Sequence, residues 1–170
     1  MYNFSMNDKN QSYEIGMLLK SRGLWLATAE SCTGGLLGHL ITTTAGSSEY
    51  YLGGFITYSN ETKEHWLGVD SATLKQYGAV SRETVLEMAR GVRNSFGENT
   101  QPEKIIGISI SGIAGPGGGS PEKPVGTVWF GISSASGDEA FMFQFRGNRS
   151  RVKLRSAEKA LHLLISHLQQ

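Results

Sequence analysis

A short polar run, Glu30-Ser31-Cys32-Thr33-Gly34-Gly35, separates an apolar segment from a helical pattern. At such a strand-to-helix junction, side chains lie at the carboxyl end of the strand. The unpaired N–H groups of the helix can there hold an anion or a developing oxyanion. Ser31 is therefore a candidate nucleophile, although Ser31 and Thr33 could equally do no more than cap the helix. Cys32 is a rival nucleophile, because thiols attack more readily, but a lone cysteine is more often a small buried hydrophobe.

A base for a serine nucleophile is available in the segment that contains Tyr58 and Lys63. If Asn60 is the N-cap of the following helix, Lys63 falls in the first turn, where the helix dipole disfavours an ammonium group. A lysine that stays neutral can act as a base, and a Ser–Lys pair is a known variant of the serine nucleophile arrangement. The simpler alternative is that Lys63 is a solvated surface residue.

Two further segments could bind an anion. The glycine-rich loop Ser111–Ser120 follows a buried strand, where α/β sheets bind ligands, and its N–H groups could form a nest for a phosphate or carboxylate. It matches neither the Walker nor the GxGxxG pattern, because no Gly-Lys-Ser/Thr follows and Pro116 and Pro121 interrupt it. Arg149 precedes the last predicted helix and could clamp a phosphate, or lie on an ordinary solvated face.

Composition excludes several classes of protein. Lys and Arg number 16 against 15 Asp and Glu, so a strongly basic nucleic-acid binder is not expected. The single cysteine and the spacing of the four histidines predict no disulfide, no metal site and no cofactor. Apolar runs are shorter than the ~20 residues of a membrane helix, and the N-terminus has no apolar signal core. A cytoplasmic domain that does not bind membranes is expected.

The elements that must position these residues alternate between strands and helices. Strands are predicted over 24–29, 55–58, 105–110, 125–133 and 141–145. Helices are predicted from Ser12, over 36–41, after Ser59, over 82–96 and from about Ser150. This order predicts a three-layer α/β/α domain with a mixed, mostly parallel sheet and a late antiparallel hairpin. Residues 1–11 are expected to be a flexible polar leader and residues 12–170 a single domain.

Six short sequence blocks, taken together in their order along the chain, carry information that the spacing of single residues does not. They are TAESCTGG at 28–35, AGSS at 45–48, TYSNE at 57–61 with Lys63, GAVS at 78–81, SISGIAGP at 109–116 and KPVGTV at 123–128. Over roughly residues 12–168, these blocks resemble the CinA C-terminal domain family. Its characterised stand-alone members are nicotinamide mononucleotide (NMN) amidohydrolases.

The resemblance implies hydrolysis of the NMN carboxamide to nicotinic acid mononucleotide and ammonia, without a metal. The family's catalytic serine falls on Ser31 and its lysine on Lys63, with Tyr58 beside them. The residues expected to contact the substrate are Glu30, Thr33, Gly34, Gly35, Ser48, Ser111, Gly112, Ile113, Gly115 and Arg149. The resemblance also implies a homodimer, for which the aromatic pair Tyr50-Tyr51 offers a candidate contact.

Two positions depart from the family pattern: Gly117 stands where many members have Asp, and Asn148 stands where a Gly-Asp-Arg run is usual. The main alternative is a pyridine-nucleotide-binding module without turnover, although a pure binder needs no combination of Ser31, Tyr58 and Lys63. Release of ammonia from NMN would separate the two hypotheses. A cysteine hydrolase that uses Cys32 is the third hypothesis.

Overall fold

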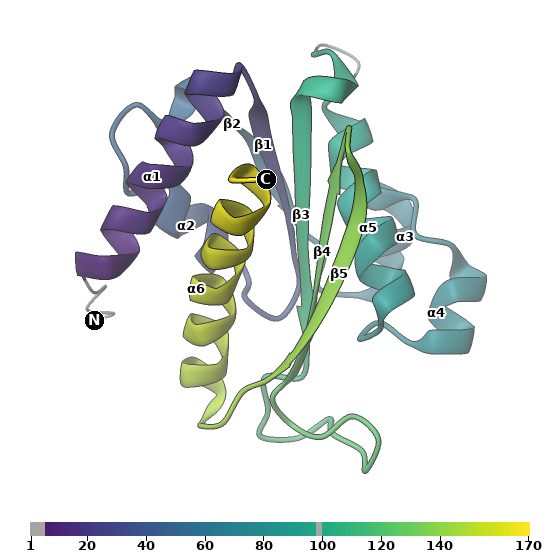
Figure 1. The fold of residues 1–170 in the computed structure, drawn as a ribbon. Helices are drawn as coiled ribbons and strands as arrows, with labels where there is room; N and C mark the ends of the chain where they lie inside the picture. The colour runs from purple at the N-terminus through teal and green to yellow at the C-terminus, as the bar shows by residue number, and fades with distance from the viewer. Residues whose placement is uncertain (1–5, 98–99) are drawn as a thin grey trace.

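A five-stranded sheet in the order β2-β1-β3-β4-β5 forms the middle layer of the computed structural model, which describes residues 6–97 and 100–170 (Figure 1). Its strands are β1 (Trp25–Glu30), β2 (Tyr51–Ile56), β3 (Ile105–Gly112), β4 (Thr127–Ser134) and β5 (Gly137–Gln144). The helices are α1 (Met6–Arg22), α2 (Leu36–Thr42), α3 (Asn60–Leu67), α4 (Ser71–Tyr77), α5 (Arg82–Ser95) and α6 (Arg149–Leu168), with short 3-10 turns η1 (Ser47–Glu49) and η2 (Pro102–Lys104).

The pairing of the strands confirms an α/β sheet with a late hairpin and corrects one detail. Strand β1 runs parallel to both β2 and β3, whereas β3, β4 and β5 are antiparallel neighbours. Two of the four strand pairings are therefore parallel, so the sheet is mixed but not mostly parallel. The loop that connects β3 to β4 contains no helix, whereas the connection between neighbouring parallel strands is usually an α-helix.

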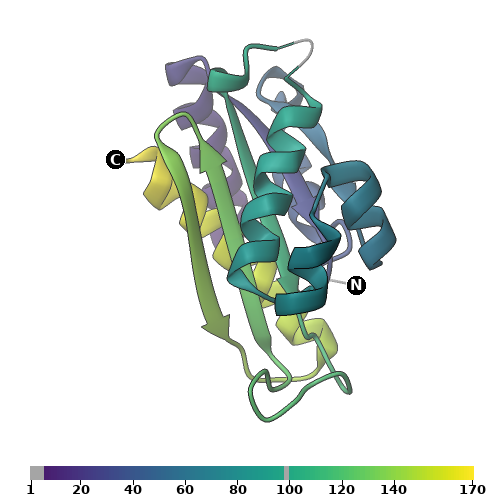
Figure 2. The same ribbon diagram turned by 90° about the vertical axis from the view of Figure 1, so that its right-hand side faces the viewer.

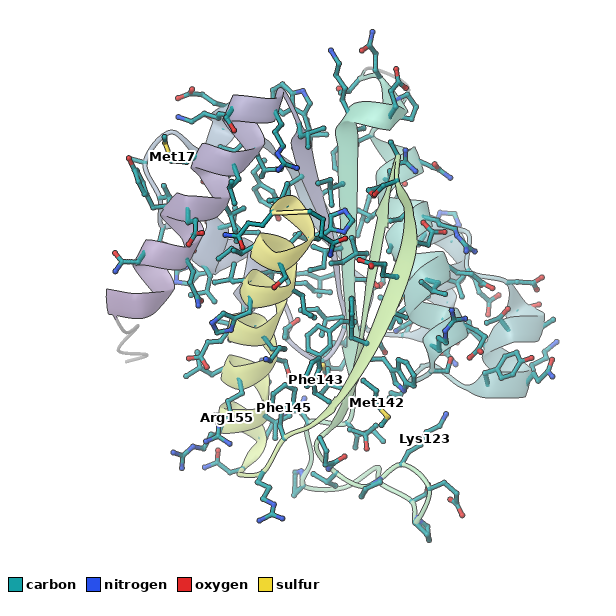
Figure 3. All side chains as sticks on the ribbon, viewed as in Figure 1. Met17, Lys123, Met142, Phe143, Phe145 and Arg155 are labelled. Atoms are coloured by element: carbon teal, nitrogen blue, oxygen red, sulfur yellow. The ribbon has the colours of Figure 1, made fainter. Side chains whose placement is uncertain are left out.

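Helices cover both faces of the sheet. Helices α1, α2 and α6 lie on one face, and α3, α4 and α5 lie on the other (Figures 1 and 2). Phe143 and Phe145 point from the β5 end of the sheet toward α6 (Figure 3), and with Phe141 they pack against the core on that face, as their alternation predicts. Among the described residues, no helix has the length and hydrophobicity needed to cross a membrane.

The N-terminal helix begins earlier than the sequence suggests. Residues 1–5 of the predicted leader lie outside the described residues, whereas residues 6–11 belong to α1, which starts at Met6. Gln11 is buried, and its amide contacts the ring of His162 on α6. A buried polar side chain needs such a partner inside the protein.

The aromatic pair at 50–51 is not the exposed surface that the sequence suggests. Tyr50 is fully buried, and a Cβ on Gly16 of α1 would lie only 2.7 Å from its ring. Tyr51 is half-buried and its hydroxyl pairs with that of Thr28 at 2.8 Å. This pair therefore closes the core beside α1 and β1 and does not form a surface contact.

The order of the strands places three carboxyl ends side by side. From β1 the chain passes through α2 to β2, then through α3, α4 and α5 to β3 on the other side of β1. A crevice forms outside the strand ends where the connections diverge in this way, and α/β proteins bind ligands there. The residues that follow β1, β2 and β3 are Ser31, Thr57 and the loop after Gly112.

Candidate active site

Ser31 and Lys63 meet at this crevice. Ser31 directly follows β1, and its N–H donates to the carbonyl oxygen of Ile110 on β3 at 2.9 Å. The Nζ atom of Lys63 lies 3.3 Å from the Oγ atom of Ser31. Lys63 is only 1% exposed and Ser31 is 9% exposed, so this is not a pair of solvated surface residues.

Local hydrogen bonds in α3 explain how Lys63 reaches Ser31. The N-cap is Ser59 rather than Asn60: the Ser59 hydroxyl accepts from the N–H of Thr62 at 3.3 Å, and the Thr62 hydroxyl accepts from the N–H of Ser59 at 3.2 Å. This reciprocal capping box fixes the start of the helix. Lys63 follows one residue later and directs its amine back over Thr57 and Ser59, donating to their carbonyl oxygens at 2.8 and 3.4 Å.

The protonation state of Lys63 follows from its burial. Loss of water around the amine lowers its pKa from 10.5 to about 8, although the nearby Cys32 opposes this in part. A neutral amine has two hydrogens and one lone pair. The carbonyl oxygens of Thr57 and Ser59 can only accept hydrogen bonds, so in the neutral form they take both hydrogens. The lone pair is then directed at the hydroxyl of Ser31.

Cys32 lies beside Ser31 but is held in its unreactive form. Its side chain is buried, and burial raises the pKa of the thiol to about 12. The thiolate, not the thiol, is the nucleophile, so a cysteine in this state reacts slowly. The structure therefore favours the serine over the cysteine as nucleophile.

The two residues open into a cavity of about 210 Å³. It is lined by Ser31, Cys32, Tyr58, Asn60, Lys63, Ala79, Val80, Ser111, Gly112, Ala114 and Arg149. The hydroxyl of Ser111 donates to the carbonyl oxygen of Ala79 at 2.7 Å, which links β3 to the loop before α5. Because the hydrogen is used in this bond, Ser111 can only accept hydrogen bonds from anything in the cavity.

Tyr58 and Arg149 pair at the rim of the cavity. Tyr58 is 59% exposed, and its hydroxyl accepts a hydrogen bond from the guanidinium of Arg149. The same guanidinium donates to the carbonyl oxygen of Gly115 at 2.7 Å. Arg149 thus connects α6 to the segments after β2 and β3, and Lys63 is oriented by Thr57 rather than by the hydroxyl of Tyr58.

The carboxylate of Glu30 binds N–H groups at the start of α2, and Glu30 does not line the cavity. Its buried carboxylate accepts from the N–H groups of Gly35, Leu37 and Gly38 at 2.9, 3.1 and 2.8 Å. The N–H of Gly34 is also taken, by the carbonyl oxygen of Ser31 at 3.1 Å. In this structure the carboxylate of Glu30 and the N–H groups of Gly34 and Gly35 are therefore used within the chain, at the start of α2.

Other predicted contact residues lie away from the cavity. Ser48 precedes β2, whereas Ser31 follows the parallel strand β1, so the two lie at opposite ends of the sheet, roughly 20 Å apart at ~3.3 Å per residue. Ser48 therefore cannot contact a ligand held by Ser31 of the same chain. Thr33, Ile113 and Gly115 do not line the cavity either. Gly115 acts indirectly, through its carbonyl bond to Arg149.

Some cavity residues were not predicted as functional. Beside the cavity, the carbonyl oxygen of Thr57 binds the amine of Lys63, and no sequence signal could find this group because every residue has a carbonyl group. Asn60, Ala79, Val80 and Ala114 also line the cavity. All four stand in or beside the blocks used for the resemblance, which was the available signal.

The two departures from the family pattern have small structural consequences. Asn148 is the N-cap of α6, and its side chain accepts from the N–H of Arg151 at 3.0 Å. Asparagine and aspartate cap helices about equally well, so this substitution preserves the start of the helix. Gly117 is exposed, and a Cβ there would meet no atom within 4 Å. Among the described residues, no three His, Cys, Asp or Glu side chains gather as a metal site would require.

Comparisons with known proteins place these features in a family. The chain is 51% identical over 147 residues to nicotinamide-nucleotide amidohydrolase PncC of Enterobacter agglomerans, covering 86% of each chain. It is 44% identical over 165 residues to a CinA-like protein of Thermotoga maritima, covering 97% of this chain but only 39% of the other. The crystal structure of competence/damage inducible protein CihA from Agrobacterium tumefaciens superposes with a TM-score of 0.89 at 37% identity over the full length of both chains. The CinA C-terminal domain family matches residues 8–168, and this chain belongs to that family.

Proposed function

We propose that this chain hydrolyses the carboxamide of NMN to nicotinic acid mononucleotide and ammonia. The observation that carries the proposal is the buried contact of 3.3 Å between the Lys63 amine and the Ser31 hydroxyl. A Ser–Lys pair is a recognised nucleophile–base arrangement, and it is of no use to a protein that only binds a nucleotide. The identity of 51% to PncC, a nicotinamide-nucleotide amidohydrolase, supports this choice of substrate.

The first half of the reaction forms an acyl-enzyme. The Oγ atom of Ser31 attacks the carboxamide carbon, and its proton passes to the neutral amine of Lys63. The bond from that carbon to the amide nitrogen then breaks, and ammonia leaves with the proton from Lys63. Water attacks the acyl carbon in the second half, Lys63 takes its proton, and Ser31 recovers its hydrogen as the acid is released.

The oxyanion of the tetrahedral intermediate needs hydrogen-bond donors near Ser31. Glu30 occupies the N–H groups of Gly35, Leu37 and Gly38, which removes them as candidates. We assign the role to the N–H group of Cys32, which lines the cavity and directly follows the nucleophile. Hydrolases commonly use the N–H of the residue after the nucleophile in this way.

Ser111 and Arg149 select the substrate in this proposal. A hydroxyl that can only accept hydrogen bonds suits the NH₂ group of a carboxamide and disfavours the carboxylate of the product. Arg149, at the rim, is suited to the 5′-phosphate, because a guanidinium pairs with phosphate through two parallel hydrogen bonds. Tyr58 presents an exposed aromatic ring beside it, against which a pyridine ring can stack.

The test is incubation of the purified chain with NMN, with ammonia and nicotinic acid mononucleotide measured together. The chain should release both in equal amounts, and Ser31→Ala should lose at least about a thousandfold in kcat while it still binds NMN in calorimetry. Binding of NMN without turnover by the unmodified chain would instead support the nucleotide-binding module. Activity of Ser31→Ala within about tenfold of the unmodified chain would remove Ser31 as the nucleophile.

A further inference from the structure

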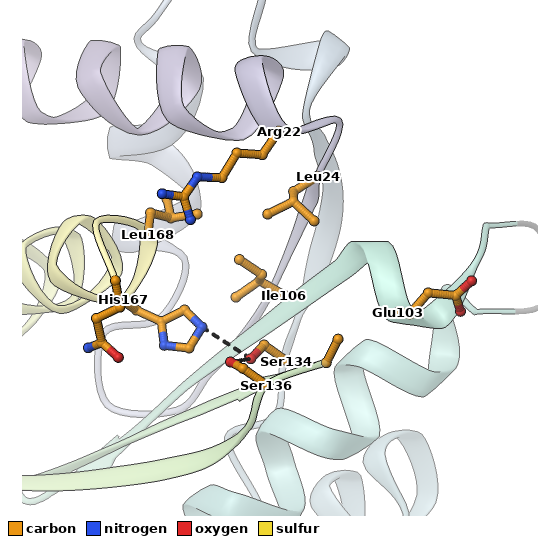
Figure 4. Close-up of a pocket in the computed structure, with 10 residues that line it drawn as sticks. Arg22, Leu24, Glu103, Ile106, Ser134, Ser136, His167 and Leu168 are labelled. Atoms are coloured by element: carbon orange, nitrogen blue, oxygen red, sulfur yellow. Dashed lines mark hydrogen bonds between the residues drawn. The ribbon is translucent and has the colours of Figure 1, made fainter.

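A second, larger cavity lies at the opposite end of the sheet from Ser31. Its volume is about 350 Å³, and it is bounded by the end of α1, the end of α6 and the β4–β5 hairpin (Figure 4). It is lined by Arg22, Leu24, Glu103, Ile106, Ser134, Ala135, Ser136, His167, Leu168 and Gln170. Figure 4 shows Leu24 and Ile106 pointing toward each other, with the His167 ring turned toward Ser134.

Three polar side chains form a continuous hydrogen-bonded line beside this cavity. Nε2 of His167 lies 3.1 Å from Oγ of Ser134, and Nδ1 of His167 lies 3.1 Å from a carboxylate oxygen of Glu139. Ser134 is 8% exposed and itself lines the cavity. A nucleophile, a base within hydrogen-bond reach and a third group that orients the base make up the arrangement of hydrolytic triads.

The proton positions in this line follow from what each group can do. The carboxylate of Glu139 can only accept, so it holds the hydrogen of a neutral imidazole on Nδ1. Nε2 then has a free lone pair and can only accept, so the hydroxyl of Ser134 can donate to it at 3.1 Å, a shorter contact than the 3.3 Å to its other acceptor, the carbonyl oxygen of Gly137. The neighbouring hydroxyl of Ser136, 2.8 Å from that of Ser134, can donate to the Ser134 oxygen in turn. Ser134 is therefore placed to lose its proton to His167.

We propose that Ser134, His167 and Glu139 form a second hydrolytic centre, independent of Ser31, which cleaves small uncharged esters with a short acyl chain. The apolar side chains of Leu24 and Ile106 suit the acyl group. Arg22 and Glu103 carry opposite charges at the same cavity, so neither sign of substrate charge is favoured over the other. The volume limits the substrate to a small molecule.

The reaction needs only water as a co-reactant. Oγ of Ser134 bonds to the ester carbonyl carbon while its proton passes to Nε2 of His167. The bond from that carbon to the alcohol oxygen breaks, and the alcohol leaves with the proton from Nε2. Water then attacks the acyl carbon and gives a proton to Nε2, and Ser134 takes that proton as its bond to carbon breaks. One ester and one water become one carboxylic acid and one alcohol.

The hairpin supplies a donor for the oxyanion. Ser134 pairs with Gly137 at the end of the ladder, so Ala135 lies outside the paired register. We assign the oxyanion role to the N–H of Ala135, because this residue directly follows the nucleophile, as the oxyanion donor does in many serine hydrolases. If these three side chains only held α6 to the hairpin, they would form the same hydrogen bonds but would not react with an ester.

The experiment uses Ser31→Ala as the starting protein, so that only the second centre can react. Its probes are a fluorophosphonate label, located by peptide mass spectrometry, and 4-nitrophenyl acetate. The label is expected on Ser134. Hydrolysis of 4-nitrophenyl acetate should fall at least about a hundredfold when His167→Gln is added. His162→Gln on the same helix and Ser133→Ala beside Ser134 are the matched controls, and both should change the rate less than about threefold.

The proposal is overturned if the label does not attach to Ser134, or if His167→Gln and His162→Gln have equal effects. If His167→Gln fails to fold, the labelling of Ser31→Ala alone tests the proposal, because this variant leaves Ser134, His167 and Glu139 unchanged. Ammonia release from NMN by the unmodified chain is measured separately and depends on Ser31. Failure of one proposal therefore leaves the other standing.

Discussion

The carbonyl oxygen of Thr57 accepts a hydrogen bond of 2.8 Å from the amine of Lys63, and this bond holds the Nζ atom 3.3 Å from the Oγ atom of Ser31. The capping box of α3 and the end of β2 hold this carbonyl in place. A backbone atom therefore orients the base, so substitution of the Thr57 side chain leaves the orientation intact.

The pH dependence of the reaction should report the state of Lys63. Burial lowers the pKa of this amine to about 8, and the base is active only when neutral. We therefore expect kcat/KM for NMN to rise about tenfold from about pH 7 to a plateau above about pH 9. Lys63→Arg should be as inactive as Lys63→Ala, because a guanidinium keeps its proton. Substantial activity in Lys63→Arg would make Lys63 an electrostatic anchor, and Tyr58 the next candidate for the base.

Exchange of the adjacent thiol should have little effect on catalysis. Burial raises the pKa of Cys32 to about 12, so the side chain stays a thiol near neutral pH. Cys32→Ala should keep kcat within about threefold of the unmodified chain, and iodoacetamide should alkylate the native protein far more slowly than the unfolded one. A folded Cys32→Ala protein without activity would instead support the cysteine hydrolase.

The role of Ser111 can be separated from its structural bond by comparison with Ser109. Both hydroxyls project from the same face of β3 and donate to a backbone carbonyl oxygen, that of Ala79 at 2.7 Å and that of Val85 at 2.6 Å. Only Ser111 lines the cavity. Ser111→Ala should lower kcat/KM for NMN about five- to tenfold, the effect of one lost hydrogen bond to the NH₂ group.

The methyl ester that corresponds to NMN provides the decisive control, because its leaving group has no N–H. Ser111→Ala should leave hydrolysis of this ester nearly unchanged, and Ser109→Ala should affect the amide and the ester alike. Equal losses on both substrates in Ser111→Ala would show that Ser111 only holds β3 to the loop before α5.

Arg149 should contribute to binding only when the substrate has a phosphate. Arg149→Ala is expected to raise KM for NMN at least about tenfold but to change KM for nicotinamide riboside less than about twofold. Arg155→Ala, an exposed arginine on the same helix, is the matched control and should alter neither. Equal effects of Arg149→Ala on both substrates would assign Arg149 to its contacts with Tyr58 and Gly115 alone.

Local signals in the sequence predicted the elements that depend on local interactions. Helix α5 begins after Ser81 as expected, because its hydroxyl caps the N–H of Thr84 three residues later. The local pattern predicts a strand over 55–58, whereas β2 spans Tyr51–Ile56. Its two central glycines have low strand propensity, and the strand exists because it pairs along β1, a contact that local patterns do not contain.

The same distinction holds for the candidate site. Ser31 and Lys63 were predicted together from residue type, helix position and resemblance, and their separation of 3.3 Å agrees with the pairing. The function of Glu30 was not predicted, because its carboxylate reaches N–H groups five to eight residues away only after α2 has folded. Ser48 was assigned by resemblance alone, and the strand register separates it from Ser31.

The residues to which we assign bond cleavage and the choice of amide and phosphate come from two separate stretches of chain. Ser31 and Lys63 are 32 positions apart and belong to one β-α-β-α segment, whereas Ser111 and Arg149 belong to β3 and α6. In the proposed function, bond cleavage is thus encoded in the first stretch, and the groups that select the carboxamide and the phosphate are encoded in the second. Substitutions in the second stretch can change which amide is bound while the first stretch stays the same. Relatives that catalyse the same reaction can therefore differ in substrate.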